Sequence, residues 1–308
     1  MAEVDALTAR TPAFSVIIAV YNDWVSLERC LRSLDGQMSA PAFEVVVADD
    51  GSISNAPSSI SKGQRNFPLK IVRQAHQGIS PARNLGIQNA RGSLLVFVDA
   101  DCILREDCLA ALQRGIDQRT QDNYFQLRLI GDCTNLVGRA EELRLATIQN
   151  HTLQPDGYIR YLNTAGFAIR RARPDTAGRV FDPAAQRAED TLLLANLMQS
   201  GKLPWFVNEA IVQHAIPLSL GACLVKDVRS AYLERVTYGM IAAKGVKFRV
   251  SHRERLSMLR SMWTISARRS IGRSAWFVLT TRQFLRFSML LMTDVRRLRD
   301  PRGSAKSS

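Results

Sequence analysis

Three apolar runs rich in β-branched residues constrain most strongly what this chain can fold into. The runs are Phe14–Val20, Phe43–Ala48 and Ser93–Val98, and segments with helical spacing of apolar residues lie between them. Continuous apolar runs of this length are typical of strands that are buried on both faces of a parallel sheet. The alternation of strands and helices therefore predicts an α/β fold with a mixed, mostly parallel sheet flanked by helices.

Composition excludes several classes of protein. With 46% hydrophobic and 22% charged residues, the chain has the composition of a globular protein with a core, not of a disordered or collagen-like chain. The five cysteines are scattered and form no CxxC pair, which argues against a disulfide framework and against a structural zinc site.

Acidic residues follow two of the apolar runs directly, and a third acidic pair opens a later helical pattern. They are Asp49-Asp50, Asp99-x-Asp101 and Glu189-Asp190. Ligands of open α/β sheets bind at the carboxyl ends of the strands. Because several carboxylates at one edge are costly unless a cation lies among them, we expect a divalent cation, Mg²⁺ or Mn²⁺, shared with substrate phosphates.

The charge of the chain is distributed unevenly. The net charge is +13, and residues 217–308 carry 19 Lys and Arg against 5 Asp and Glu, so the preceding part is close to neutral. We interpret residues 13–215 as a catalytic domain and residues 216–308 as a basic, helical C-terminal extension. The partner of such an extension is anionic: membrane lipid, nucleic acid or a phosphorylated substrate.

One stretch of the basic extension has the spacing of an amphipathic helix. Between Trp276 and Leu298, apolar residues recur every three or four positions, while Arg282, Arg286 and Arg297 fall on the other face. This pattern suits a helix that packs on the catalytic domain with its arginines in water, and it suits peripheral attachment to anionic lipid equally well. Without a signal peptide or an uncharged run of spanning length, we expect a cytoplasmic location or the inner face of the membrane.

Four segments together resemble the family 2 inverting glycosyltransferases, which have the A-type, Rossmann-like nucleotide-sugar-binding fold. They are FSVIIAVYN, VVVADDGS, HQGISPARNLGIQNARGSLLVFVDADC and FDPAAQRAEDTLLLANLMQSG, and they occur in the order and spacing of the family over about residues 13–215. The resemblance implies transfer of a sugar from a nucleoside diphosphate sugar, UDP-linked, to a hydroxyl of a glycan or of a lipid-linked glycan acceptor.

The resemblance also implies a set of nucleotide-binding residues. Asp50 would accept a hydrogen bond from the base, with Tyr21 and Asn22 forming the wall of the base pocket. The alternative role of Asp50 is to cap the turn that follows it. Asp99 would touch the ribose, or the metal through water. Arg83 lies on the segment that closes over the nucleotide, where it would pair with phosphate or, equally, form a structural bridge with Asp99.

The resemblance also implies a metal site in which Asp101 is the direct ligand. Asp101 would bind the cation, and His214 matches a position where some relatives carry a histidine near the metal; a purely structural histidine is the equal alternative. Cys102 stands where the family has an acid or a polar residue, so the metal affinity is expected to differ. The other histidines, His76, His151 and His252, belong to no motif, and we interpret them as structural.

The catalytic residues implied by the resemblance are Asp190 and Glu189. Asp190 would be the general base that takes the proton of the acceptor hydroxyl as it attacks the sugar, while the metal offsets the charge on the leaving diphosphate. Glu189 would orient the base or the acceptor. The alternative role of Asp190 is to cap the helix that follows it.

Three other functions fit parts of the sequence. A nucleotidyltransferase on a related sheet is disfavoured because the turn after the first run, AVYND, contains no glycine for a phosphate loop. A basic protein that binds nucleic acid without catalysis is disfavoured because the extension has no recognition motif. The joint presence of Asp50, Asp101 and Asp190 argues against a degenerate transferase that only binds its ligands.

Overall fold

The computed structural model describes residues 11–171, 179–215, 219–245, 252–268 and 271–285. Its strands are β1 (Phe14–Val20), β2 (Phe43–Asp49), β3 (Leu69–Arg73), β4 (Leu94–Asp99), β5 (Cys102–Leu104), β6 (Tyr124–Gly131), β7 (Phe167–Arg170) and β8 (Trp205–His214). Its helices are α2 (Trp24–Asp35), α3 (Ser58–Ser61), α4 (Ile79–Gln88), α5 (Cys108–Gln118), α6 (Leu136–Thr152), α7 (Glu189–Gln199), α8 (Leu220–Ala243) and α9 (His252–Arg268), and residues 273–285 are also helical.

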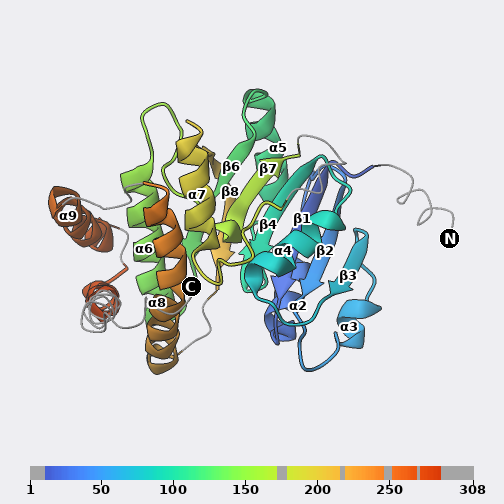
Figure 1. Cartoon of the computed structure of the whole chain (residues 1–308), viewed down its shortest axis with the longest axis horizontal. Helices are drawn as coiled ribbons and strands as arrows, with labels where there is room; N and C mark the ends of the chain where they lie inside the picture. The colour runs from blue at the N-terminus through green and yellow to red at the C-terminus, as the bar shows by residue number, and fades with distance from the viewer. Residues whose placement is uncertain (1–10, 172–178, 216–218, 246–251, 269–270, 286–308) are drawn as a thin grey trace, which may run out of the picture.

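The strands form one mixed sheet in the order β3-β2-β1-β4-β7-β6-β8-β5, with helices on both faces (Figure 1). The first four strands in this order are parallel, and β7 is antiparallel to both β4 and β6. Side chains of α2 and α5 share one core cluster with the sheet, while α4 and α7 share a second cluster. This architecture confirms the expected mixed α/β sheet.

Close packing on β1 fixes the position of α4. Every residue of β1 is buried, as its apolar run predicts. A Cβ on Gly86 of α4 would lie 2.4 Å from Cγ2 of Ile17, so only glycine allows this approach. The helix begins after Gly78, whose φ of 103° favours glycine. The N-terminus of α4 and the loop before it are therefore held close to the carboxyl ends of β1 and β2.

The second half of the sheet differs from the expected pattern in three places. Residues 119–160, which show no clean period, form β6 and α6. The sequence pattern predicts a strand over Leu162–Ile169, whereas the structure has a short 3₁₀ turn there, followed by β7. The sequence pattern also predicts two short strands, Trp205–Val207 and Ala210–Val212. In the structure they form one strand, β8, which has an irregular register against β6 and pairs with β5 at its outer edge.

The C-terminal helices pack against the sheet-bearing part of the chain. Ile241 of α8 shares a cluster with Leu192 of α7, and Ala275 shares one with Leu143 of α6. No helix among the described residues is long and apolar enough to cross a membrane. The division of the chain at residues 215 and 216 stays a prediction.

The helical pattern predicts Arg282 on an exposed cationic face, but in the structure this residue is buried. It is 8% exposed, and its guanidinium donates to both carboxylate oxygens of Asp227 in α8, at 2.7 and 3.2 Å. Phe284 is one of the apolar residues of this helical pattern, which predicts it on the packed face, but it is 72% exposed. The faces are reversed because an arginine with a buried carboxylate partner is stable inside the fold. Arg286 and Arg297 lie outside the described residues.

Replacement of Arg282 by methionine should therefore destabilise the fold by about 2–3 kcal/mol, because the buried carboxylate of Asp227 loses this ion pair. Thermal unfolding measures the change. The further replacement of Asp227 by asparagine should restore part of the loss. An unchanged melting temperature for Arg282→Met would place Arg282 on the surface after all.

Candidate active site

The predicted site residues come together at one edge of the sheet. In the parallel register, Val20 lies opposite Asp49, and Ala19 lies opposite Asp99. The residues that follow these strands, Tyr21 and Asp50 among them, therefore leave the sheet at the same edge. Figure 1 shows that α4 lies in front of these strand ends and that α7 begins beside them.

Asp50 organises the loop that leads into α4. Its carboxylate accepts hydrogen bonds from the side chain of Gln74 at 2.7 Å and from the backbone N–H groups of Gln77 and Gly78 at 2.9 and 2.8 Å. Nδ1 of His76 lies 2.8 Å from the same carboxylate. The turn-capping role that was the alternative for Asp50 belongs to Asp49, which accepts from the N–H of Ser52 at 2.8 Å.

Tyr21 and His76 form a stacked pair of rings at the edge. Their ring centroids are 4.1 Å apart with an interplanar angle of 18°, and Tyr21 is 46% exposed. His76 was interpreted as structural, but it belongs to this site. The sequence carried no signal for it, because the parallel pairing of β2 and β3 brings it to Tyr21. Asn22 links the end of β1 to the loop after β2, since its side chain accepts from the N–H of Ile53 at 2.7 Å.

Arg83 joins two of the three acidic groups. Its buried guanidinium donates to Oδ1 of Asp99 at 2.6 Å and to the carboxylate of Glu189. Burial disfavours its charge, but the two carboxylates outweigh burial and raise the pKa of Arg83 above its usual range. Of the two roles expected for Arg83, the bridge to Asp99 is therefore present, and the bridge extends to Glu189.

The start of α7, which carries Glu189 and Asp190, is strained and well anchored. Ala188, just before it, has a left-handed φ of 56°, which is costly for a residue with a Cβ. The preceding loop is held by Ser80, which donates to the carbonyl of Ala185 at 2.8 Å, and by Thr237, which donates to the carbonyl of Arg187 at 2.5 Å. Such strain persists only where surrounding contacts fix the backbone.

The surroundings of Asp190 favour its protonated form. Burial and the neighbouring charge of Glu189 raise the pKa of Asp190 to about 7. Its carboxylate also accepts from the backbone N–H of Thr191 at 2.6 Å, so it satisfies one amide at the start of α7. A carboxyl group with this pKa changes protonation near neutral pH, which is the requirement for a general base.

Asp101 and His214 form the candidate metal centre. The pairing of β5 with β8 places His214 beside the residue that follows Asp101, and Nε2 of His214 is 3.3 Å from the Asp101 carboxylate. Nδ1 lies 3.4 Å from Glu141. Burial lowers the pKa of His214, but Asp101 and Glu141 outweigh burial and raise it to about 10. The two carboxylates on either side of the imidazole therefore favour the protonated form of His214.

The donor atoms at this centre fit a divalent cation. Ligand atoms of Asp101, Cys102 and His214 lie within 4.8 Å of one another. Burial raises the pKa of the Cys102 thiol well above its usual range, and a protonated thiol is a poor ligand. A carboxylate and an imidazole remain, which suit Mg²⁺ or Mn²⁺ once His214 has lost its proton.

Sequence reasoning missed the residues behind this centre. Arg144 donates to both carboxylate oxygens of Glu141, at 2.9 and 2.6 Å, and this pair holds the side chain that faces His214. Tyr161 is near both, and its hydroxyl accepts from Asn163 at 3.1 Å. The spacing of Glu141 and Arg144 on one helix was the available signal.

Comparison with known proteins gives matches to one family. Residues 15–176 match the family described as Glycosyl transferase family 2. The uncharacterized glycosyltransferase YfnE of Bacillus subtilis is 40% identical over 97 residues, which are 31% of this chain and 25% of YfnE. Glycosyltransferase AglE of Haloferax volcanii is 32% identical over 114 residues, or 36% of each chain. The match thus spans between a quarter and about a third of these relatives.

Solved structures share the fold. The mannosyltransferase PcManGT from Pyrobaculum calidifontis, in complex with GDP-Man and Mn²⁺, has a TM-score of 0.59 at 17% identity, over 94% of this chain and 81% of the other. Residues 1–349 of TarS from S. aureus give a TM-score of 0.53 at 17% identity, over 90% and 88%. At such identity the likeness concerns the fold.

Proposed function

The chain belongs to glycosyl transferase family 2, whose profile matches just over half of its length, and from this membership we propose that it is an inverting glycosyltransferase assisted by a divalent cation. It moves a sugar from a nucleoside diphosphate sugar to a hydroxyl of a glycan or of a lipid-linked glycan acceptor in polysaccharide biosynthesis. The observation that carries this proposal is the bridge through Arg83, which holds Asp99 of the sheet edge next to the Glu189-Asp190 pair.

In the proposed mechanism Asp190 is the general base. An inverting transfer needs a carboxylate that takes the proton of the acceptor hydroxyl while the leaving diphosphate departs from the opposite face of the sugar. A pKa of about 7 leaves much of Asp190 ionised at neutral pH and makes it a stronger base than an exposed aspartate. Glu189 raises that pKa, and its bridge to Arg83 fixes the backbone that carries Asp190.

The donor is held by the other side chains at the edge. Two solved structures that share the fold contain a nucleoside diphosphate sugar: PcManGT contains GDP-Man with Mn²⁺, and a TarS structure with a TM-score of 0.50 to this chain contains UDP-GlcNAc. These ligands support a nucleoside diphosphate sugar as the donor class. Following the motif resemblance, we propose a UDP-linked donor. Its base lies at the wall of Tyr21 and Asn22 beside Asp50, and its ribose lies at Asp99.

Asp101 and His214 hold the cation in this proposal, with Asp99 contacting it through water. When bound, the cation offsets the negative charge that develops on the leaving diphosphate. The carboxylate of Glu141 orients His214 from behind, as carboxylates commonly do for metal-binding histidines.

Mn²⁺ together with UDP should raise the melting temperature of the protein by about 5 °C, because ligands that bind only the folded state stabilise it by mass action. His214→Ala should lose most of this increase, since it removes one of the two direct ligands. The matched control is His151→Ala, because His151 lies on α6 and not at the metal centre. An equal increase in His214→Ala and wild type would remove His214 from the metal site.

Product analysis tests the proposed reaction. The protein is incubated with Mn²⁺, a panel of UDP- and GDP-sugars and candidate acceptors, and the released phosphates are identified. We expect free nucleoside diphosphate and a product of inverted anomeric configuration. Release of pyrophosphate would show nucleotidyl transfer. Steeply salt-dependent binding of oligonucleotides without any donor turnover would favour the nucleic-acid-binding alternative.

We also propose that the protein works at the inner face of a membrane. The surplus of basic residues after residue 216 supports an anionic surface as the partner, and a lipid-linked acceptor would be presented there. The reversed orientation of Arg282 and Phe284 requires a different contact surface from the one that the sequence pattern indicated.

A further inference from the structure

We propose that the outward face of α8 docks on an anionic lipid surface. The face is defined by Val225, Arg229, Tyr232 and Val236, and it is called the α8 stripe below. These residues follow one another at spacings of four, three and four, so they share one side of the helix. That docking would bring the enzyme to a lipid-linked acceptor rests on the proposed function. The docking itself is argued only from the exposed apolar and cationic side chains.

The polarity of α8 is reversed compared with an ordinary surface helix. Its buried positions include polar and charged residues, namely Asp227, Ser230, Glu234 and Thr237. Its exposed positions include large apolar ones: Val225 is 70% exposed, Tyr232 63% and Val236 59%. A surface helix in water normally buries its apolar side and exposes its polar side. An exposed apolar stripe on such a helix marks an interaction surface.

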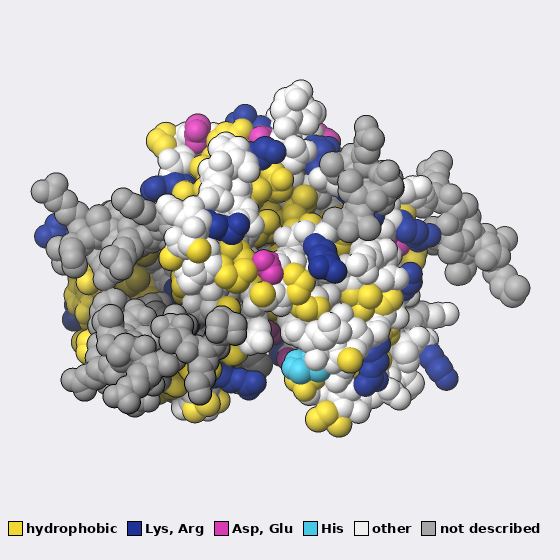
Figure 2. Space-filling model, viewed as in Figure 1, with side chains coloured by type: hydrophobic (Ala, Val, Ile, Leu, Met, Phe, Trp, Pro, Cys, Tyr) yellow, Lys and Arg dark blue, Asp and Glu magenta, His cyan; other side chains and the backbone are white. Residues whose placement is uncertain are grey.

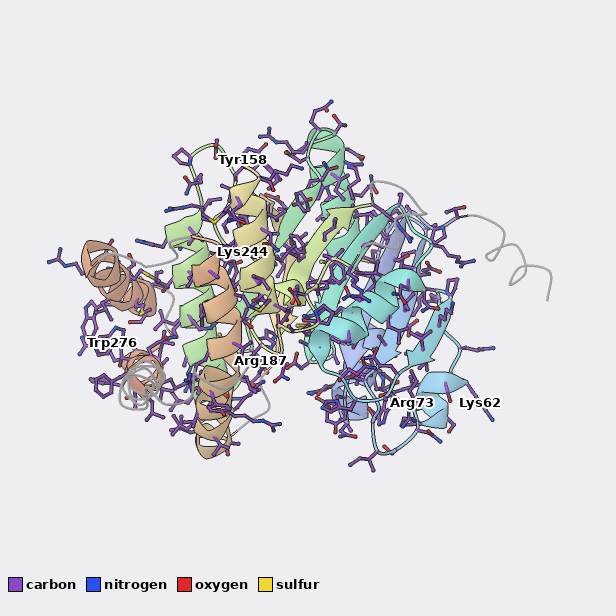
Figure 3. All side chains as sticks on the ribbon, in the orientation of Figure 1. Lys62, Arg73, Tyr158, Arg187, Lys244 and Trp276 are labelled. Carbon is purple, nitrogen blue, oxygen red and sulfur yellow. The ribbon has the colours of Figure 1, made fainter. Side chains whose placement is uncertain are left out.

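The buried polar residues of α8 have a structural reason. Asp227 pairs with Arg282, Ser230 accepts from the guanidinium of Arg187 at 3.2 Å, and Thr237 donates to the carbonyl of Arg187. In Figure 3, Arg187 lies beside α8, three residues before Asp190 in the sequence. The inward side of α8 therefore anchors the loop that leads into α7. The contacts within the described part of the chain give the apolar outward side no such role.

Charge selects the partner for this surface. In residues 219–245, 257–267 and 271–285, the only acids are Asp227 and Glu234, and both are buried. Exposed cations in the same ranges include Lys226, Arg229, Lys244, Arg260 and Arg273. Figure 2 shows Lys and Arg side chains spread over the whole face in view, with few acidic side chains among them. On α8 itself, the exposed apolar side chains lie among Lys226, Arg229 and Lys244 with no exposed carboxylate, which matches an interface with anionic lipid.

The same charge argues against a second copy of the chain as the partner. Two copies would bring like-charged surfaces together, in a protein whose net charge is +13. Lipid headgroups neutralise this charge, and the acyl boundary accepts the valines and the tyrosine. Two aromatic residues of the other C-terminal helices, Phe277 at 61% and Trp263 at 45%, are also exposed and are of the type enriched at membrane surfaces.

Vesicle co-sedimentation of the full chain tests the proposal. We expect binding to vesicles that contain phosphatidylglycerol, weaker binding at high salt, and little binding to phosphatidylcholine alone. Val225→Glu with Val236→Glu should weaken binding at least about tenfold, because each change removes apolar contact and adds repulsion. Arg229→Gln should weaken it about fivefold. Val25→Glu is the matched control, because Val25 lies on α2 and is 76% exposed. This variant should bind vesicles like wild type.

Three results would overturn the proposal. The first is no binding of the wild type to anionic vesicles, and the second is equal binding by the wild type and the double glutamate variant. The third is a dimer in solution that the double variant dissociates while vesicle binding stays unchanged, because the stripe would then bind a second copy. Donor turnover is measured separately without vesicles, so failure of the proposed reaction and failure of the docking are distinguishable.

Discussion

Asp190→Asn should reduce sugar transfer by about a hundredfold to ten-thousandfold, which is the usual contribution of a general base, while the donor still binds. Asparagine keeps the shape of the side chain but cannot take the proton of the acceptor hydroxyl. Steady-state kinetics give kcat, and a separate titration gives the affinity for the nucleotide. Asp182→Asn is the matched control, because Asp182 is an exposed aspartate on the loop that precedes α7. A variant within tenfold of wild-type kcat would rule out Asp190 as the base.

The raised pKa of Asp190 also predicts two pH effects. In wild type, kcat should rise with pH through about 7, because only the ionised carboxylate is active. Between about pH 4 and pH 7 the unfolded state loses this proton while the folded state keeps it, so Asp190 lowers stability as pH rises and its full cost is present above pH 7. At pH 8 the free energy of unfolding of Asp190→Asn should then exceed that of wild type by about 1–3 kcal/mol, and near pH 4 the two should not differ.

Arg83→Met should destabilise the protein by about 3–5 kcal/mol, or lower its melting temperature by roughly 10 °C. The guanidinium is buried and pairs with Asp99 and Glu189, so its loss leaves the charge of the buried Glu189 without this partner. It also removes the side-chain bond between α4 and the first residue of α7.

A second replacement identifies the cause of the Arg83 effect. Adding Glu189→Gln to Arg83→Met should restore part of the stability, because the remaining buried group is then neutral. Arg32→Met is the control: this arginine pairs with Glu28, but its side chain is 73% exposed, and its loss should cost less than about 0.5 kcal/mol. If the added Glu189→Gln lowered stability further, the bridge would not be the source of the effect.

The parallel half of the sheet could be predicted from the sequence because its signals are local. The apolar runs that begin at Phe14, Phe43 and Ser93 become β1, β2 and β4 with boundaries within one residue. A run that is buried on both faces stays apolar whichever strand lies beside it. The family and the A-type fold could be predicted for the same reason, because the motifs lie at the ends of these strands. The comparisons confirm both.

The second half could not be predicted because its buried residues are partly polar. Gln149 of α6 accepts from the N–H of Leu129 at 2.9 Å, and Glu142 accepts from the N–H of Gly131 at 2.7 Å. These polar side chains face β6, so α6 shows no apolar period. Their partners become visible only when the two elements are packed together.

The candidate site shows the same division. The acidic groups at the strand ends were expected at one edge, and the structure brings Asp50, Asp99 and Asp101 there. The partners that set their chemistry were not found, because His76 and Glu141 come from other elements and stand in no motif. The roles assigned to these residues remain proposals.

A crystal structure of the protein with UDP and Mn²⁺ tests the central claim most directly. The anomalous signal of manganese locates the cation independently of the nucleotide. The account predicts one manganese ion beside Asp101 and His214, shared with the diphosphate, and the base at the wall formed by Tyr21 and Asn22. A manganese ion and a nucleotide bound away from the carboxyl ends of β1, β2 and β4 would contradict it.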